Sequence, residues 1–113
     1  MNAKTTKNEI DACELLDTLE ITKIQRRTTS GGAWVRGKIG GHRFDALVFA
    51  EHADHADFEL ENSRISKLWL QRIDDRVMVA NFDRGWDIRP TTEMAKTIVG
   101  LLAAGLAEHI FGE

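Results

Sequence analysis

The sequence predicts an α+β domain, in which an antiparallel meander packs against a C-terminal helix and a shorter helix lies near the N-terminus. Two tight turns predict the meander, because the glycine pair at 40–41 and the aspartate pair at 74–75 each divide two runs of strand-forming residues. An apolar pattern with helical spacing follows Pro90 and predicts the packing helix. The meander has four strands, or five if residues 20–29 also form a strand.

Length and composition limit the class of protein. The 113 residues suffice for a single domain, residues 1–113, in which residues 1–7 form a flexible tail. The net charge of −3 is slightly acidic, and so it does not indicate a strongly basic nucleic-acid binder. The single cysteine, Cys13, cannot form an internal disulfide, and the charged N-terminal segment does not resemble a secretory signal. We therefore expect a cytoplasmic protein that does not enter a membrane.

The first element is expected to be a helix over residues 8–19. Asn8 suits the N-cap position, and an apolar face follows at helical spacing. This face consists of Ile10, Cys13, Leu16 and Leu19, which makes Cys13 a small core residue. Residues 20–29 fit either a continuing helix or a strand, and their β-branched content favours a strand.

Residues 33–39 and 42–50 form the first predicted hairpin, with a type I′ turn at the two glycines. Outward from this turn the predicted pairs are Ile39 with His42, Gly37 with Phe44, Arg36 with Asp45, and Val35 with Ala46. The Phe44 ring can then cover the bare backbone of Gly37. The side chains expected in the core are Val35, Ile39, Phe44, Ala46 and Val48.

Residues 64–73 and 76–83 form the second predicted hairpin. Strict alternation places Leu68, Leu70, Val77 and Val79 on the core side. The opposite side then carries Ile65, Lys67, Trp69, Gln71, Ile73, Arg76, Met78 and Phe82.

A long helix is predicted from residue 94 to residue 111. Pro90 and the Thr-Thr-Glu sequence after it are typical of a helix start, and Gly112 can end the helix. The predicted core face consists of Ala95, Ile98, Val99, Leu102, Leu106 and Ile110. Because one helix covers one face of a sheet, and both faces carry large apolar residues, we expect self-association as a homodimer.

Aromatic and basic residues alternate on the sheet face away from the helix. The expected interaction surface consists of Trp34, Arg36, Lys38, Arg43, Lys67, Trp69 and Arg76. The first interpretation is a non-enzymatic protein-interaction module that uses this surface. The alternative is nucleic-acid binding through the same face, since aromatic rings stack on bases and cations contact phosphates. The net charge disfavours this alternative.

Two loops could instead hold a metal or a small ligand. His52, Asp54, His55 and Asp57 offer imidazole and carboxylate ligands, although their spacing fits no established zinc pattern and a polar surface loop explains them more simply. Asp83, Arg84, Trp86 and Asp87 surround Gly85 and could line a ligand pocket. The alternative is structural: these residues brace the passage to the last helix, with Trp86 filling the edge of the core. No cofactor motif is present, and no cofactor is expected.

Three short segments carry a family resemblance: residues 34–39 (WVRGKI), residues 64–69 (RISKLW) and residues 83–87 (DRGWD). They are similar to a family of small uncharacterised bacterial domains, over residues 33–111. The members of this family are often carried on plasmids and prophages. The resemblance implies a mobile genetic element as the source, and it implies no activity and no catalytic residues.

Overall fold

The computed structural model describes residues 12–28 and 31–112. Its elements, in chain order, are α2 (Ala12–Asp17), β1 (Glu20–Arg26), β2 (Ala33–Ile39), β3 (His42–Val48), the 3-10 turn η1 (Ala56–Phe58), β4 (Ile65–Arg72), β5 (Met78–Asp83), β6 (Trp86–Ile88) and α3 (Glu93–Phe111). The six strands form one antiparallel sheet in the order of the chain. The α+β class is confirmed. The predicted tail, residues 1–7, lies outside the described residues.

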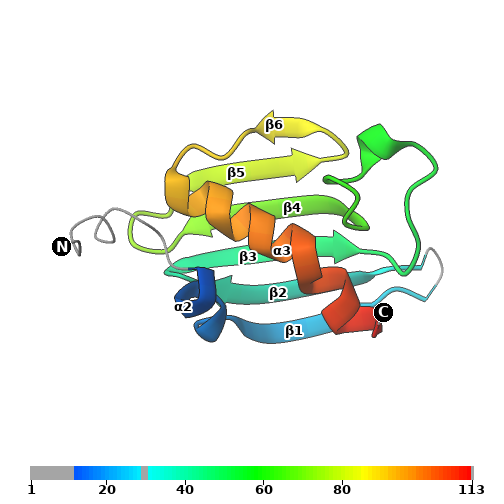
Figure 1. The fold of residues 1–113 in the computed structure, drawn as a ribbon, viewed down its shortest axis with the longest axis horizontal. Helices are drawn as coiled ribbons and strands as arrows, with labels where there is room; N and C mark the ends of the chain where they lie inside the picture. The colour runs from blue at the N-terminus through cyan, green and yellow to red at the C-terminus, as the bar shows by residue number, and fades with distance from the viewer. Residues whose placement is uncertain (1–11, 29–30, 113) are drawn as a thin grey trace.

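The helix α3 crosses one face of the sheet, and Figure 1 shows it in front of the strands. Thr92 caps its start by accepting a hydrogen bond from the Ala95 N–H at 2.9 Å, and Gly112 ends it with a φ of 78°. All six residues predicted for its core face are buried. Among the described residues α3 is the one helix long and apolar enough to cross a membrane, yet its buried residues belong to the protein core.

The first hairpin has the predicted register at every predicted pair. Gly40 and Gly41 form the turn with φ values of 54° and 74°, which glycine adopts without the steric penalty of a Cβ. The Phe44 ring lies so close to Gly37 that an added Cβ would stand 2.8 Å from it. Arg36 and Asp45 form the predicted ion pair, with Nε and Oδ1 2.8 Å apart.

The number of strands differs from the prediction. Residues 20–26 form β1, so the preference for a strand there is confirmed. The sheet nevertheless has six strands rather than four or five, because β6 was not predicted. With three residues after Gly85, β6 is too short to show an alternating pattern.

Two bulges overturn part of the predicted sides of the second hairpin. Leu68, Leu70 and Val79 are buried as predicted, whereas Ile65 and Phe82 are buried against the prediction. Leu47 pairs with Lys67 and Val48 with Ile65, so Ser66 is an extra residue that turns Ile65 into the core. A second irregularity leaves Val79 without a partner on β4 and turns Phe82 into the core. The Val79 carbonyl instead accepts a hydrogen bond from the Thr91 N–H at 3.0 Å. Bulges defeat a prediction from strict alternation, because each one reverses the faces of the residues that follow it.

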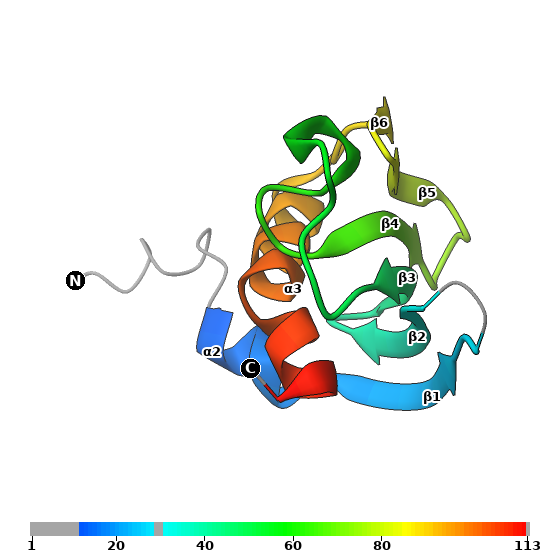
Figure 2. The same cartoon turned by 90° about the vertical axis from the view of Figure 1, so that its right-hand side faces the viewer.

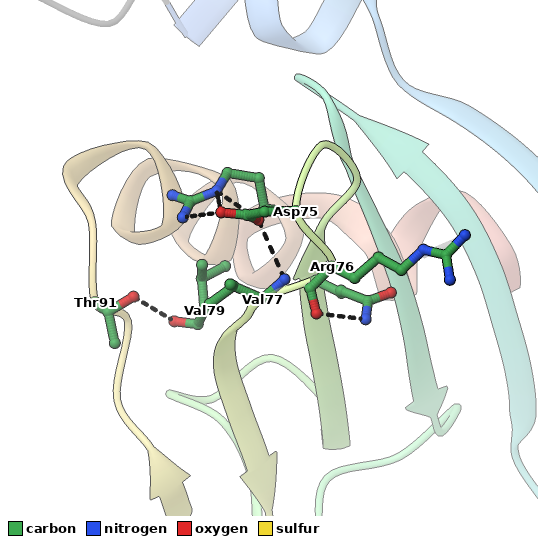
Figure 3. Close-up of polar contacts among 7 residues, drawn as sticks. Asp75, Arg76, Val77, Val79 and Thr91 are labelled. Carbon is green, nitrogen blue, oxygen red and sulfur yellow. Dashed lines mark hydrogen bonds and ion pairs between the residues drawn. The ribbon is translucent and has the colours of Figure 1, made fainter.

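The connection between β4 and β5 is longer than a two-residue turn. Asp75 accepts hydrogen bonds from the Arg72 guanidinium at 2.8 Å and from the Val77 N–H at 3.2 Å, as Figure 3 shows. These bonds, the Arg72 bond foremost, lower the pKa of Asp75 to about 2. Val77 lies in this connection and is 45% exposed, so its predicted place in the core is wrong.

The short helix α2 docks through a different side chain from those predicted. Leu15 is buried against Gly40, and the Thr18 hydroxyl accepts a hydrogen bond from the Gly40 N–H at 2.8 Å. Cys13 is exposed and Leu16 is 47% exposed, which corrects the expectation that both lie in the core. A helix of six residues offers the sheet little more than one side chain. Asn8 and Ile10 lie outside the described residues.

Candidate functional site

The sheet has one covered face and one open face. Figure 2 shows α2 and α3 on the same side of the sheet. We call the opposite side the open face. Its described members include Lys23, Gln25, Trp34, Arg36, Lys38, Arg43, Asp45, Leu47, Lys67, Trp69 and Gln71. Six of the seven residues predicted for an interaction surface lie there. The sheet therefore brings these six together as the alternation of β2, β3 and β4 predicts.

Cations stand directly opposite each other on the open face. Lys23 of β1 pairs with Arg36 of β2, and Lys38 of β2 pairs with Arg43 of β3. Like charges in directly opposed positions destabilise a sheet. The Arg36 charge is balanced by Asp45 on its other side. Glu20 of β1 likewise stands opposite Lys38 on its other side. The open face therefore carries opposed cations whose charge is balanced in part by neighbouring carboxylates.

Both predicted tryptophans lie on the open face. Trp34 is 38% exposed, and it stands between Gln25 and Leu47 on the neighbouring strands. Trp69 is half-buried opposite Asp45. A shallow hollow of about 340 Å³ is lined by Lys23, Gln25, Trp34, Arg36 and Asp45. An aromatic ring at the side of a basic hollow can anchor a partner while the cations bind its anionic groups.

Arg76 is the one predicted surface residue that the sheet does not bring to the open face. It lies in the β4–β5 connection with a φ of 61°, and its carbonyl accepts a hydrogen bond from Gln71 Nε2 at 2.9 Å. Figure 3 shows its side chain extending away from Asp75.

The loop that follows β3 is organised around one buried carboxylate. Glu59 accepts hydrogen bonds from the Ala53 N–H and from His52 Nδ1, both at 2.7 Å. Burial raises the pKa of Glu59, but these hydrogen bonds outweigh burial and hold the pKa below its ordinary value. Sequence reasoning did not identify Glu59, because a carboxylate in a polar loop gives no sign of burial.

The four predicted metal ligands do not converge. His52 is bonded to Glu59, His55 packs edge-on against Phe58 with ring centroids 5.3 Å apart, and Asp54 and Asp57 are exposed. Across residues 12–28 and 31–112 no group of three or more His, Cys, Asp or Glu side chains is placed to hold a metal ion.

The predicted pocket residues at 83–87 separate into different environments. Trp86 packs edge-on against Phe82, with ring centroids 5.2 Å apart, and so fills the edge of the core. Asp83 lies 3.6 Å from Lys67 Nζ, and Asp87 is exposed. Arg84 turns towards the other loop, and its guanidinium lies 5.7 Å from the centre of the Phe58 ring.

A cavity of about 720 Å³ opens where these two loops meet. The strand ends and the loop that line it lie at the end of the sheet opposite the Gly40–Gly41 turn, which is the right-hand side of the ribbon in Figure 1. Its walls come from Arg27, Gly31 and Gly32, the end of β3, the loop at 50–59, the start of β4 and Arg84. Sequence reasoning missed the cavity because its lining residues come from five separate stretches of chain.

Comparison with known proteins gives a family. A family model described as "Domain of unknown function (DUF7678)" matches residues 33–107, which run from the start of β2 into the last turns of α3. Neither the curated proteins nor the solved structures contain a match to the chain.

Proposed function

Since the chain belongs to the DUF7678 family, whose description names no function, we propose from its surface that it is a non-enzymatic protein-interaction module. Its partner is an acidic segment of another protein, bound on the open face. The observation that carries this proposal is the two pairs of directly opposed cations, Lys23 with Arg36 and Lys38 with Arg43. An anionic partner would relieve the repulsion between them.

Charge complementarity favours a different protein, and not a second copy of this chain, as the partner on the open face. Two copies pressed together through their open faces would bring the same cations into contact, and like charges across an interface are unfavourable. Trp34 supplies the apolar contact that a purely electrostatic patch lacks, because tryptophan buries a large area when a partner covers it.

A second candidate is single-stranded nucleic acid, which Trp34 favours because an exposed ring beside cations can stack on a base. Two observations weigh against it. The chain carries a net charge of −3, and the loop that follows β3 places Glu51, Asp54 and Asp57 beyond the end of the same sheet. These carboxylates would repel a phosphate backbone that extended past the cations, whereas a short acidic segment can lie over the cations alone.

The genetic source of the protein and its cellular location are also proposals. The likeness of residues 34–39, 64–69 and 83–87 to domains from plasmids and prophages supports a mobile genetic element as the source. A single exposed cysteine fits a reducing cytoplasm.

Fluorescence anisotropy with two labelled probes tests the proposal. One probe is a peptide of alternating Glu and Leu, and the other is single-stranded DNA of similar length. We expect the peptide to bind, and we expect the double variant Lys38→Glu, Arg43→Glu to bind it at least about tenfold more weakly. The matched control is the double variant Arg89→Glu, Lys96→Glu, which reverses two exposed charges outside the open face.

The outcomes separate the two candidates. Peptide binding that is lost in the open-face variant and kept in the control supports the protein partner. If only the DNA binds, with an affinity that falls steeply as the salt concentration rises, the open face recognises nucleic acid and not a protein partner. If neither probe binds, or if both variants lose binding equally, the open face is not the working surface.

A further inference from the structure

We propose that the cavity at the end of the sheet is a binding site for a small aromatic anion, a planar ring that carries a phosphate or a carboxylate. This site is separate from the proposed protein-binding surface and shares with it only the margin formed by Leu47 and Lys67. Its volume of about 720 Å³ lies in the range of small-molecule sites, which is about 300 to 1,000 Å³.

The apolar part of the cavity suits a flat ring. Leu47 and Phe49 line it from the end of β3, and Phe58 lines it from the loop that ends in η1. Phe58 is 43% exposed, so part of its ring is accessible to a ligand in the cavity. Gly32 backs the Phe49 ring so closely that an added Cβ would lie 2.8 Å from it.

Cations border this apolar part. Arg84 holds its guanidinium 5.7 Å from the Phe58 ring centre, and Lys67 lines the cavity from β4. The Lys67 ammonium lies 3.6 Å from the Asp83 carboxylate, a distance at which an exposed ion pair exchanges easily for a ligand. Because Arg84 already lies over the face of Phe58, a ligand ring would pack against the edge of Phe58, with its anionic group towards Arg84 and Lys67.

The backbone is strained where it presents arginines to the cavity. Arg84 has a φ of 54° and Arg64 a φ of 67°, in the left-handed region that costs a residue with a Cβ about 1 kcal/mol or more. Glycine would avoid this cost at both positions. Arg64 uses its side chain to hold the wall, because Nη1 donates a hydrogen bond to the Ala50 carbonyl at 2.8 Å. Such strain concentrates at functional sites.

The opposite wall is already formed without a ligand. The buried Glu59 carboxylate ties the loop together through His52 and the Ala53 N–H. This leaves Glu51 and Asp54 exposed on the cavity rim, where they can accept hydrogen bonds from N–H groups on the ring. An aromatic anion with N–H donors, such as a purine nucleotide or an indole carboxylate, can bind both walls. Its anionic group would bind Arg84 and Lys67, and its N–H groups would donate to Glu51 and Asp54.

Chemical-shift mapping of the ¹⁵N-labelled protein by NMR tests the assignment. The probes are AMP and indole-3-acetate, which join a ring to an anion, and adenosine and inorganic phosphate, which supply one part each. We expect AMP or indole-3-acetate to shift the amides of residues 47–54, 58–59, 64–67 and 84, and to bind at least about tenfold more tightly than adenosine or phosphate. The comparison of AMP with adenosine isolates the contribution of the phosphate, because the two probes share the same ring and sugar.

Paired variants make the result specific to the cavity. Arg84→Gln should weaken binding by about tenfold or more, whereas Arg89→Gln, an exposed arginine outside the cavity, should leave it unchanged. The proposal is overturned if none of the four probes shifts the cavity amides, or if Arg84→Gln binds as the wild type does. Shifts confined to Trp34, Arg36 and Arg43 would also overturn it, while leaving the open face as a surface that binds anions.

Discussion

At the scale of single residues, Glu59 shows how a carboxylate can order a loop that has almost no regular structure. Its side chain is 4% exposed and accepts bonds from His52 and the Ala53 backbone. A buried acceptor that loses its donors costs more than the bond itself contributes. Glu59 therefore ties the loop at 50–59 to itself, and the Arg64 side chain joins the loop to the start of β4 through the Ala50 carbonyl.

The lowered pKa of Glu59 gives a prediction about acid stability. A carboxyl group whose pKa is lower in the folded chain stabilises the fold above its unfolded pKa, and that stability is lost as the pH falls. Glu59→Gln should therefore reduce stability at pH 7 and flatten the decline below about pH 4.5. Urea unfolding at several pH values measures both effects.

Glu61→Gln is the control for Glu59→Gln, because Glu61 is an exposed carboxylate two residues along the same loop. If both variants show the acid profile of the wild type, Glu59 is not the group that makes the loop sensitive to acid.

At the scale of elements, the contact between β1 and β2 depends on the missing side chain of Gly37. A Cβ at this position would lie 2.6 Å from the Glu20 carbonyl and 2.8 Å from the Phe44 ring. Backbone cannot move aside cheaply, so any larger residue must displace β1 or the Phe44 ring.

Gly37→Ala should therefore lower the free energy of unfolding by about 1 to 3 kcal/mol. Gly100→Ala should raise it by about 0.5 to 1 kcal/mol, because Gly100 lies in α3 with open space around it and alanine favours a helix. Urea denaturation of the two variants beside the wild type measures both changes. Equal effects of the two substitutions would contradict the close packing at Gly37.

Turn and capping preferences, which depend on neighbouring residues, correctly predicted the elements that obey them. The glycine pair at 40–41 fixes the turn and so the whole register of the first hairpin. Thr92 and Gly112 mark the ends of α3 because capping groups recur at fixed positions. These features depend on neighbouring residues, so the sequence alone was sufficient for them.

Features that depend on distant residues were not predictable in the same way. The extra residues Ser66 and Val79 look like ordinary strand residues, and only pairing with the neighbouring strands reveals them as bulges. The open face followed from alternation, whereas the cavity depends on contacts such as that of Arg84 with Phe58, across loops that have no common pattern.

At the scale of the whole molecule, the sheet has an exposed edge at β1. Six of the seven β1 residues are exposed, and one side of this strand has no partner among the described strands. Ile24, in the second half of β1, is 44% exposed. An edge strand with an exposed apolar residue is a template for pairing with another chain.

We therefore predict that the chain forms a homodimer through β1. Light scattering coupled to size-exclusion chromatography should give twice the chain mass of 12.7 kDa, and Ile24→Lys should return the protein to a monomer. Leu16→Lys is the control, because Leu16 is equally exposed but lies on α2. A wild-type mass of one chain at every concentration would contradict the prediction.

The position of α3 in the chain bears on biosynthesis. All six strands that the structure describes precede it, so a nascent polypeptide exposes the apolar face of its sheet before the helix that covers this face has been translated. Hairpins between consecutive strands form quickly because their ends are near in sequence. Stable folding must nevertheless wait for residues 93–111 to leave the ribosome, and until then the apolar side of the layer is open to chaperones and to aggregation.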